Sequence, residues 1–338
     1  MSTIKQIAQK AGVSPTTVSN VIHGRDAKVS PETLEKVKKI LQEENYATNM
    51  AAVIMAHNSS RIIGVVSFMS PRTNETTLED PFLASMLGIL EKDIHAAGYY
   101  MMVFSTTDPD EVLRLVATWK LDGLIMLWAP QNVCRKIKLS SNIPLVTIDC
   151  YFEDDGLTYY NSGTEDKAGA YEMAKYLLSM GHSRILFLTY APDSSGGDTY
   201  RYLGVQEAVA ESGMEGATVE RMYISKNREE RHVQYETLLS TPYTALMFSS
   251  DYNAVDAVLY FTGEGISIPG RFSITGFDDN LLSRIVAPRL TTVHQDIREK
   301  GCCAVSMLMK LIRGEPVDVQ NVLFPVSLVE RDSVSRID

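Results

Sequence analysis

The 338-residue sequence predicts an all-α headpiece of helix-turn-helix type, followed by an α/β core of two doubly wound lobes. Helix start signals recur within the first 46 residues. From Arg61 onward, short apolar strands alternate with amphipathic helices in two successive series. The length also favours several domains, because a single hydrophobic core rarely grows beyond about 250–300 residues.

Charge is unevenly distributed along the chain. The whole chain carries −10, but residues 1–60 hold seven Lys/Arg and five Asp/Glu, so this segment is at +2 and the rest at −12. The first segment therefore tolerates a polyanion, and the remainder repels one. No apolar run reaches the roughly 20 residues that cross a bilayer, and no signal peptide is visible. We therefore expect a cytoplasmic protein without a membrane partner.

Three short helices are indicated in the first segment by their start signals. Thr3 and Gln6 have the spacing of a capping box, and the pairs Ser14-Pro15 and Ser30-Pro31 each offer an N-cap followed by a proline at the first helical position. One small core would be closed by the apolar residues Ile4, Ile7, Ala8, Val18, Val21, Ile22, Leu34, Val37, Ile40 and Leu41.

The first two helices are joined by a very short turn. A small residue at Ala8, a glycine at Gly12 and an apolar residue at Val18 have the spacing of a helix-turn-helix. In that motif the second helix enters the major groove, and its N-terminal residues contact base edges. The residues that would then face DNA are Pro15, Thr16, Thr17 and Asn20. Spacing alone supports equally well a small helical bundle with a polar face.

The remainder of the chain has the alternation that is typical of parallel sheets. One series of strands is RIIGVVSF, YYMMVFS, DGLIMLW and PLVTID, and the second is RILFLTY, TVERMYI, TALMFSS and FSITGF. Helices such as residues 82–98 and 168–182 intervene. Apolar strands between helices predict sheets covered on both faces, and two series predict two similar lobes. Ligands of such folds bind beyond the carboxyl ends of the strands, so the cleft between the lobes is the expected site.

No catalytic constellation is visible in the sequence. The segment 263–270 lacks the spacing of a dinucleotide loop, and there is no phosphate-binding loop. Asp278 and Asp279 are adjacent, so their side chains point apart, and His182 follows a helix-capping glycine. The four cysteines have neither metal-site nor disulfide spacing. We therefore predict no enzymatic activity, no cofactor and no metal site.

The segment TIKQIAQKAGVSPTTVSNVIHGRDAKVSPETLEKVKKILQEENY resembles the DNA-binding headpiece of the lactose-repressor (LacI/GalR) family of bacterial transcription regulators. The resemblance implies that Thr16 and Asn20 read bases while Thr17 and Ser19 hold phosphates. It also implies that Arg25 or Lys28 reaches the DNA backbone.

The linker departs from the family pattern. Asn49 and Ala52 match the family, in which this hinge folds on the operator, but Thr48 replaces a proline, Val53 a basic residue and Met55 a leucine. Methionine is an apolar wedge that occurs in minor grooves, so Asn49, Ala52 and Met55 are expected to contact DNA. An ordinary flexible linker is the alternative.

The resemblance continues through LDGLIML, IPLVTID, LLSMGHSRI, FSITGFDDN and RLTTVHQDIREKG, and implies a periplasmic-binding-protein-like effector domain that dimerises. It places in the cleft Phe82, Asp149, Arg201, Ser250, Asp278 and Gln295. Family members that bind sugars usually have an aromatic residue near the position of Lys226. A cation there, beside Arg201, favours an anionic effector; a solvated loop lysine is the alternative.

The expected domains are a headpiece at 1–46, a linker at 47–60 and a core at 61–338. The core would divide into an N-lobe at about 61–160 and 291–320, and a C-lobe at about 161–290 and 321–338. We expect a homodimeric transcription regulator, a repressor, that binds a near-palindromic operator under control of a small effector, a sugar or sugar derivative. The rival classes are a solute-binding receptor, which would need an export signal, and a two-lobed α/β enzyme, which would need catalytic residues.

Overall fold

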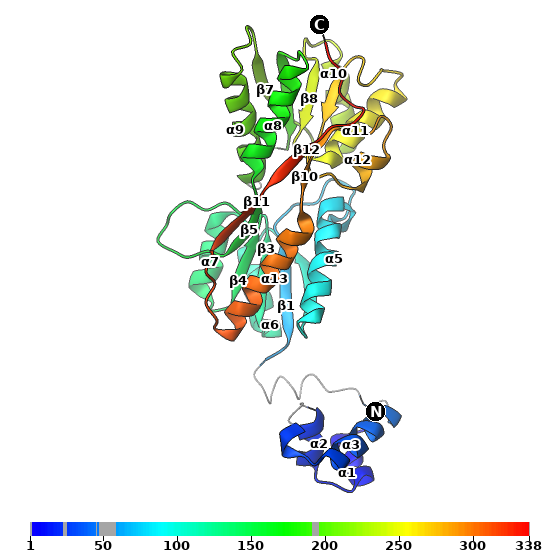
Figure 1. Cartoon of the computed structure of the whole chain (residues 1–338), viewed down its shortest axis with the longest axis vertical. Coiled ribbons are helices and arrows are strands. Elements are labelled where there is room, and N and C mark those ends of the chain that lie inside the picture. The colour runs from blue at the N-terminus through cyan, green and yellow to red at the C-terminus, as the bar shows by residue number, and fades with distance from the viewer. Residues whose placement is uncertain (1, 23–25, 45, 47–58, 191–195, 338) are drawn as a thin grey trace. The chain divides into compact units, whose positions relative to one another are not determined.

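The computed structural model describes residues 2–22, 26–44, 46, 59–190 and 196–337. Contacts divide the chain into two compact units, Met1–Ser60 and Arg61–Asp338 (Figure 1). The first unit contains the helices α1 (Ile4–Ala11), α2 (Pro15–Ile22) and α3 (Pro31–Glu43) and the short 3-10 helix η1 (Asp26–Lys28).

The predicted start signals of α1 and α3 are confirmed. Thr3 and Gln6 form a complete capping box, and the Ser30 side chain accepts a hydrogen bond from the Thr33 N–H. Gly12 ends α1 in the left-handed conformation, at φ 68°, which is accessible to glycine without strain and turns the chain into α2. The centre of the small core consists of Ile7, Ala8, Ala11, Val18, Val21 and Val37, which are all buried.

The first lobe of the second unit is built on a six-stranded parallel sheet. Its strands are β1 (Ile62–Ser67), β2 (Tyr100–Ser105), β3 (Gly123–Leu127), β4 (Leu145–Ile148), β5 (Asn161–Thr164) and β11 (Asn321–Phe324), in the order β11-β5-β4-β3-β1-β2. Its helices are η2 (Thr77–Glu79), α5 (Pro81–Ala96), α6 (Pro109–Trp119), α7 (Gln131–Ser140) and α13 (Ile297–Arg313).

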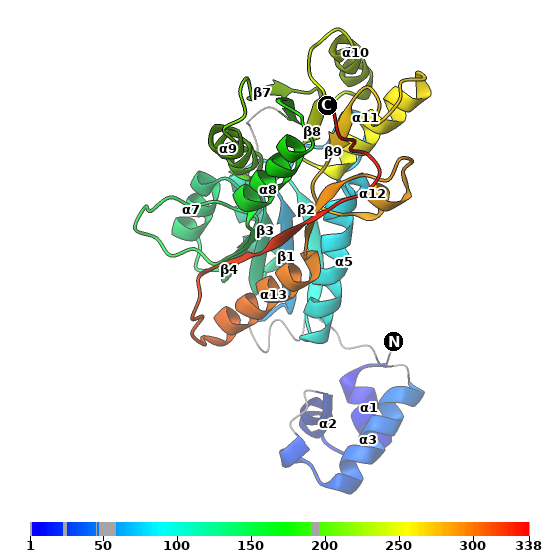
Figure 2. The same cartoon turned by 45° about the horizontal axis from the view of Figure 1, so that its top comes forward.

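Helices cover both faces of this sheet, as the apolar strands require. α5 and α13 lie side by side on one face, where Met86, Leu90 and Leu308 are fully buried (Figure 2). The opposite face packs against α6 and α7 through Val112 and Ile137.

The second lobe repeats the arrangement with four parallel strands. They are β6 (Arg184–Thr189), β7 (Thr218–Tyr223), β8 (Ala245–Phe248) and β9 (Ser273–Thr275), in the order β7-β6-β8-β9. The helices of this lobe are α8 (Asp166–Ser179), α9 (Gly196–Glu211), α10 (Arg228–Leu238), α11 (Asp251–Gly263) and α12 (Leu281–Ile285). α8 and α9 pack together on one face, and α10 and α11 cover the other.

The lobe boundaries differ from those expected. β5 and β11 pair with each other, and β5 also pairs with β4, so both strands belong to the first sheet, although the sequence assigned residues 161–164 and 321–324 to the second lobe. Conversely, β10 (Thr292–Gln295) was expected in the first lobe. It pairs antiparallel with β12 (Val326–Val329) and continues beside the second sheet through a bridge between Asp278 and His294. The chain therefore crosses between the lobes after Thr164, after Gln295 and after Phe324.

None of the helices in the described ranges combines the length and the apolar character that crossing a membrane would require.

Candidate functional site

The exposed face of α2 in the headpiece is small and uncharged. Pro15 and Thr16 are exposed, while Val18 and Val21 point inward and anchor the helix on the core. Thr17, Ser19 and Asn20 are half-buried. The Thr17 hydroxyl lies 2.9 Å from the Ser14 hydroxyl, and the Thr17 N–H donates to the same Ser14 oxygen. Ser14 thus caps the N-terminus of α2.

Of the other residues expected to contact DNA, the structure describes Lys28 alone. Lys28 is exposed in η1. Arg25 and the linker residues Asn49, Ala52 and Met55 lie outside the described residues, as do Thr48 and Val53.

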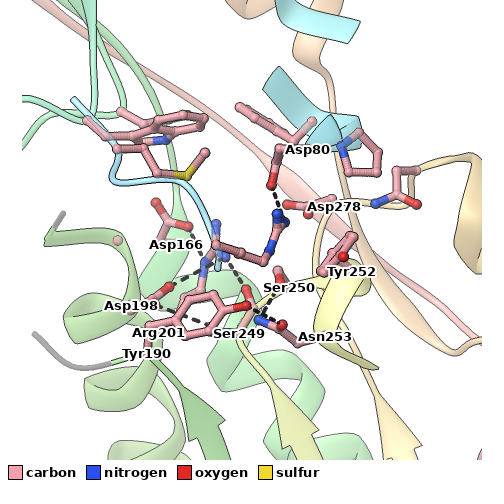
Figure 3. Close-up of a pocket in the computed structure, with 18 of the residues that line it drawn as sticks. Asp80, Asp166, Tyr190, Asp198, Arg201, Ser249, Ser250, Tyr252, Asn253 and Asp278 are labelled. Atoms are coloured by element: carbon pink, nitrogen blue, oxygen red, sulfur yellow. Dashed lines mark hydrogen bonds and ion pairs between the residues drawn. The ribbon is translucent and has the colours of Figure 1, made fainter. Parts of the chain in front are cut away.

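A pocket of about 140 Å³ lies between the two lobes of the second unit (Figure 3). A single water needs roughly 10–15 Å³ on this measure, so the pocket has room for a small organic ligand. It lies beyond the carboxyl ends of β1, β3, β4, β6, β8 and β9, as doubly wound sheets require. The six residues that the resemblance placed in the cleft line it, and so does Lys226, which was considered separately: Phe82, Asp149, Arg201, Ser250, Asp278, Gln295 and Lys226.

Arg201 is the central cation of the pocket. Its Nε donates to Asp166 at 2.6 Å, its Nη1 donates to the Ser249 carbonyl, and Asp198 lies 3.9 Å away. The guanidinium also stacks 3.7 Å above the centre of the Phe277 ring. Burial alone would lower the pKa of Arg201, but Asp166 and the other carboxylates raise it, so the side chain stays charged. Its charge is already balanced by protein groups.

Asp278 is the carboxylate with the weakest compensation. It accepts a hydrogen bond from Gln295 Nε2 at 2.7 Å, and its backbone φ of 126° holds the side chain in an uncommon direction. Burial raises the pKa of Asp278 well above its usual value, Asp251 raises it further, and Arg201 opposes both effects. A ligand hydroxyl or N–H that donates to this carboxylate would supply the missing compensation.

Asp149 has a different environment. Both of its oxygens accept from the Lys300 ammonium, at 2.9 and 2.8 Å, and the same ammonium donates to Thr164 and to Gln295 at 2.6 Å each. Burial raises the pKa of Asp149, and Lys300 opposes that shift. Asp149 therefore lines the pocket, but its acceptor capacity is largely used by the protein.

Asp279, next to Asp278 in sequence, points away from it. Its carboxylate pairs with Arg331, with Arg284 at 2.9 Å and with His294 at 3.1 Å. Asp278 and Asp279 thus have different partners, as expected for adjacent side chains that point apart. Within the described part of the chain, no group of His, Cys, Asp and Glu side chains could hold a metal ion.

Sequence reasoning missed more than half of the polar residues that line the pocket. The residues concerned are Ser70, Arg72, Asp80, Asp166, Asp198, Tyr190, Ser249, Tyr252, Asn253 and Asn280. Several occupy the first residues after a strand or the N-terminus of a helix, where Asp80-Pro81 gave a recognisable capping signal. In a doubly wound fold that position is itself a pointer to the site.

The pocket is acidic on balance. Five aspartates line it, against the cations Arg72, Arg201 and Lys226. Arg72 donates to Asp80 at 2.7 Å and to Glu75 at 3.2 Å. The Lys226 carbonyl accepts from the Thr73 N–H, and its ammonium lies 6.0 Å from the centre of the Tyr190 ring. Both arginines are thus neutralised by aspartates of the same wall.

Two family models match the chain. The model of bacterial regulatory proteins of the lacI family matches residues 3–49, and that of the periplasmic binding protein-like domain matches residues 174–334. The HTH-type transcriptional repressor PurR of Haemophilus influenzae (strain PittEE) is 30% identical over 354 aligned residues, which cover 100% of both chains.

Solved structures share the fold over nearly the whole chain. The lac repressor dimer bound to operator and the anti-inducer ONPF superposes with a TM-score of 0.83 at 24% identity, covering 99% of each chain. The complex of the transcriptional regulator CelR with cellobiose gives a TM-score of 0.71 at 21% identity, covering 99% of this chain and 100% of that one. At these identities the likeness establishes the architecture of a helical headpiece with two parallel α/β lobes.

Proposed function

Because this chain belongs to the LacI family of DNA-binding repressors with a periplasmic-binding-protein-like effector domain, we propose that its affinity for a near-palindromic operator is controlled by a small molecule bound between its lobes. The observation that carries the proposal is the pocket between the lobes, in which a carboxylate, Asp278, lacks a cation of its own. A ligand that binds one lobe arrangement better than another shifts the equilibrium between them and so changes operator affinity.

The DNA-binding role rests on the α2 surface. Thr16 and Pro15 are exposed beside the capped end of the helix, and Thr16 is proposed to contact a base edge together with Asn20. Thr17 and Ser19 are proposed to hold phosphates. Lys28, Arg25 and the linker residues Asn49, Ala52 and Met55 remain proposed DNA contacts on the resemblance alone.

The proposed effector is a sugar or sugar derivative, and the charges of the pocket favour one without negative charge. An anion, expected from Lys226 and Arg201, would enter a wall on which Arg201 is already paired with Asp166, and would face Asp278 and Asp198. Hydroxyl groups, in contrast, can donate to these carboxylates. The aromatic side chains of Phe82, Trp128, Tyr190 and Tyr252 provide apolar walls for a ring. The CelR structure contains cellobiose in a protein of this fold.

We also propose that the protein acts as a homodimer in the cytoplasm, where the operator is. α12 exposes two large apolar side chains one turn apart, Leu281 at 68% and Ile285 at 67%, and Leu259 of the neighbouring α11 is 53% exposed. Large apolar side chains exposed on neighbouring helices suit a surface that meets another copy of the chain. The lac repressor structure is that of a dimer on its operator.

Two experiments test the proposal. Selection from a random duplex library should enrich two inverted half-sites, and an unenriched library would contradict sequence-specific binding. A thermal-shift panel of neutral sugars, amino sugars, sugar phosphates and small carboxylates should show stabilisation by the uncharged or cationic compounds, because a ligand selective for the folded state raises the melting temperature. Stabilisation by sugar phosphates alone, and the loss of this stabilisation in Lys226→Met, would instead support an anionic effector.

A further inference from the structure

The loop between β1 and α5 reaches across the pocket to the second lobe. The Thr73 N–H donates to the Lys226 carbonyl at 3.3 Å, and the Tyr252 hydroxyl donates to Glu75 at 2.7 Å. Between these two contacts, the Arg72 guanidinium carbon lies 3.5 Å from the centre of the Tyr252 ring. Three interactions, made by Arg72, Thr73 and Glu75, thus join this loop to the second lobe.

Arg72 is held rigidly on its own lobe. Its side chain is only 8% exposed, although it lies in a loop. Nη2 donates to Asp80 at 2.7 Å and Nη1 donates to Glu75 at 3.2 Å, so two carboxylates orient the guanidinium plane. The guanidinium carbon fixed in this way lies over the Tyr252 ring at 3.5 Å, within the distance at which a cation and an aromatic ring attract each other.

The guanidinium of Arg72 has further N–H groups besides the two that bond Glu75 and Asp80. Its Nε is buried and has no hydrogen-bond partner among the described residues. Arg72 lines the pocket, as do Tyr190 and Tyr252 of the other lobe. A buried N–H without a partner is unfavourable, and because Nε is fully covered here, an acceptor oxygen from the pocket would reach it only after a shift of the Arg72 side chain. Figure 3 shows Asp80 and Tyr252 on the same side of the pocket as Asp278.

We infer that Arg72 and Tyr252 form a latch that holds the two lobes together over the pocket, and that the spare Nε–H of Arg72 makes this latch sensitive to an acceptor oxygen of the ligand. The inference rests on the proposed effector role of the pocket and adds the residue through which occupancy and lobe closure are coupled. Arg72 is therefore a positioning residue for closure as well as a ligand contact.

The latch can be tested without a ligand. The chain has two tryptophans, of which Trp128 lines the pocket and Trp119 is 51% exposed on α6. In a Trp119→Phe background, quenching of fluorescence by acrylamide reports access to Trp128. Tyr252→Leu, which removes the ring, should increase the Stern–Volmer constant about twofold by shifting the lobes toward open arrangements. Tyr252→Phe keeps the ring and loses only the Glu75 bond, so its increase should be smaller.

Arg72→Lys keeps the charge but loses the planar group, and should behave like Tyr252→Leu. Arg221→Lys is the matched control, because Arg221 stacks 4.6 Å from the centre of the Tyr202 ring away from the pocket, and it should leave the quenching unchanged. Unfolding by urea identifies any variant that is not folded. Unchanged quenching in both folded Tyr252→Leu and folded Arg72→Lys would overturn the latch.

The ligand contact is tested with the compound that most raises the wild-type melting temperature in the panel of neutral sugars, amino sugars, sugar phosphates and small carboxylates. Arg72→Lys should lose most of this rise, whereas Arg221→Lys should keep it. An undiminished rise in Arg72→Lys would contradict the contact. A panel in which nothing stabilises the wild type would instead contradict the proposed function, while the quenching experiment still decides the latch.

Discussion

The Lys300 ammonium lies 2.9 and 2.8 Å from the two carboxylate oxygens of Asp149, where the chain crosses between the lobes. Lys300 belongs to α13 of the first lobe, and its other two partners, Thr164 and Gln295, end the strands β5 and β10 at two of the three crossings. Gln295 in turn donates to Asp278 on the wall of the pocket. Gln295 therefore connects this buried ion pair at the crossings between the lobes to Asp278 on the wall of the pocket.

Lys300→Met is expected to destabilise the protein by about 3–5 kcal/mol, because it leaves Asp149 charged and buried without its partner. The double variant Lys300→Met/Asp149→Asn should recover much of this loss, since no uncompensated charge remains. Urea unfolding of the single and double variants measures the difference. Equal stabilities of the two would show that the Asp149 charge is compensated by something other than Lys300.

The stability should depend on pH through Asp251, which is fully buried at the start of α11. Burial raises its pKa from 3.8 to about 6, although Thr292 and the Asn280 N–H donate to it. The folded state then keeps a proton between about pH 4 and 6 that the unfolded state has released. The stabilisation of the folded state by this proton is fully present below pH 4. It is lost as the pH rises through 6, so the free energy of unfolding falls by at most about 3 kcal/mol.

Asp251→Asn removes this titration while conserving the shape of the side chain. Urea unfolding at pH 4, 5, 6 and 7 should therefore show the wild type losing stability relative to Asp251→Asn across this range. A constant difference between the two proteins would mean that the pKa of Asp251 is close to its usual value.

The contact between α8 and α9 depends on Gly204. A Cβ atom added there would lie 2.1 Å from the Lys167 carbonyl oxygen and 3.0 Å from the Tyr171 nitrogen. Gly204→Ala should therefore force the helices apart and cost about 1–3 kcal/mol. Gly263→Ala, in α11, is the control, because nothing lies within 4 Å of its added Cβ, and it should stabilise by about 0.5–1 kcal/mol. Thermal unfolding that ranks the two variants the other way would refute this packing.

Thr16→Ala tests the reading surface of α2. The exposed Thr16 hydroxyl and methyl group are proposed to contact one base pair, so their removal should cost about 1–3 kcal/mol at that position and relax sequence preference there. Competition binding with single-base operator variants measures it. Equal weakening on every sequence would assign Thr16 to the DNA backbone instead.

Much of the architecture could be predicted from local patterns. The helix caps at Thr3 and Ser30 and the apolar strands of both sheets require only nearby residues, and the observed elements follow them. The seven cleft residues line one pocket because parallel strands bring their carboxyl ends to a common edge.

The sequence could not reveal elements that depend on distant partners. β5 has the polar sequence NSGT, so it gives no apolar strand signal. These residues can be buried because Asn161 accepts a hydrogen bond from Thr147 and Ser162 donates one to the Lys300 carbonyl. Pro325, which has no N–H, separates β11 from β12, and the two strands pair in different sheets. The Lys300–Asp149 pair spans 151 positions and leaves no local pattern.

The measurement that tests the central proposal most directly is fluorescence anisotropy of a selected operator, with wild type and Asp278→Ala, with and without the most stabilising compound of the panel. The account predicts that the compound changes the operator Kd of the wild type about 5- to 150-fold. Asp278→Ala should bind the operator with near-normal affinity and show no such change. An equal change in both proteins would contradict an effector site at Asp278 between the lobes.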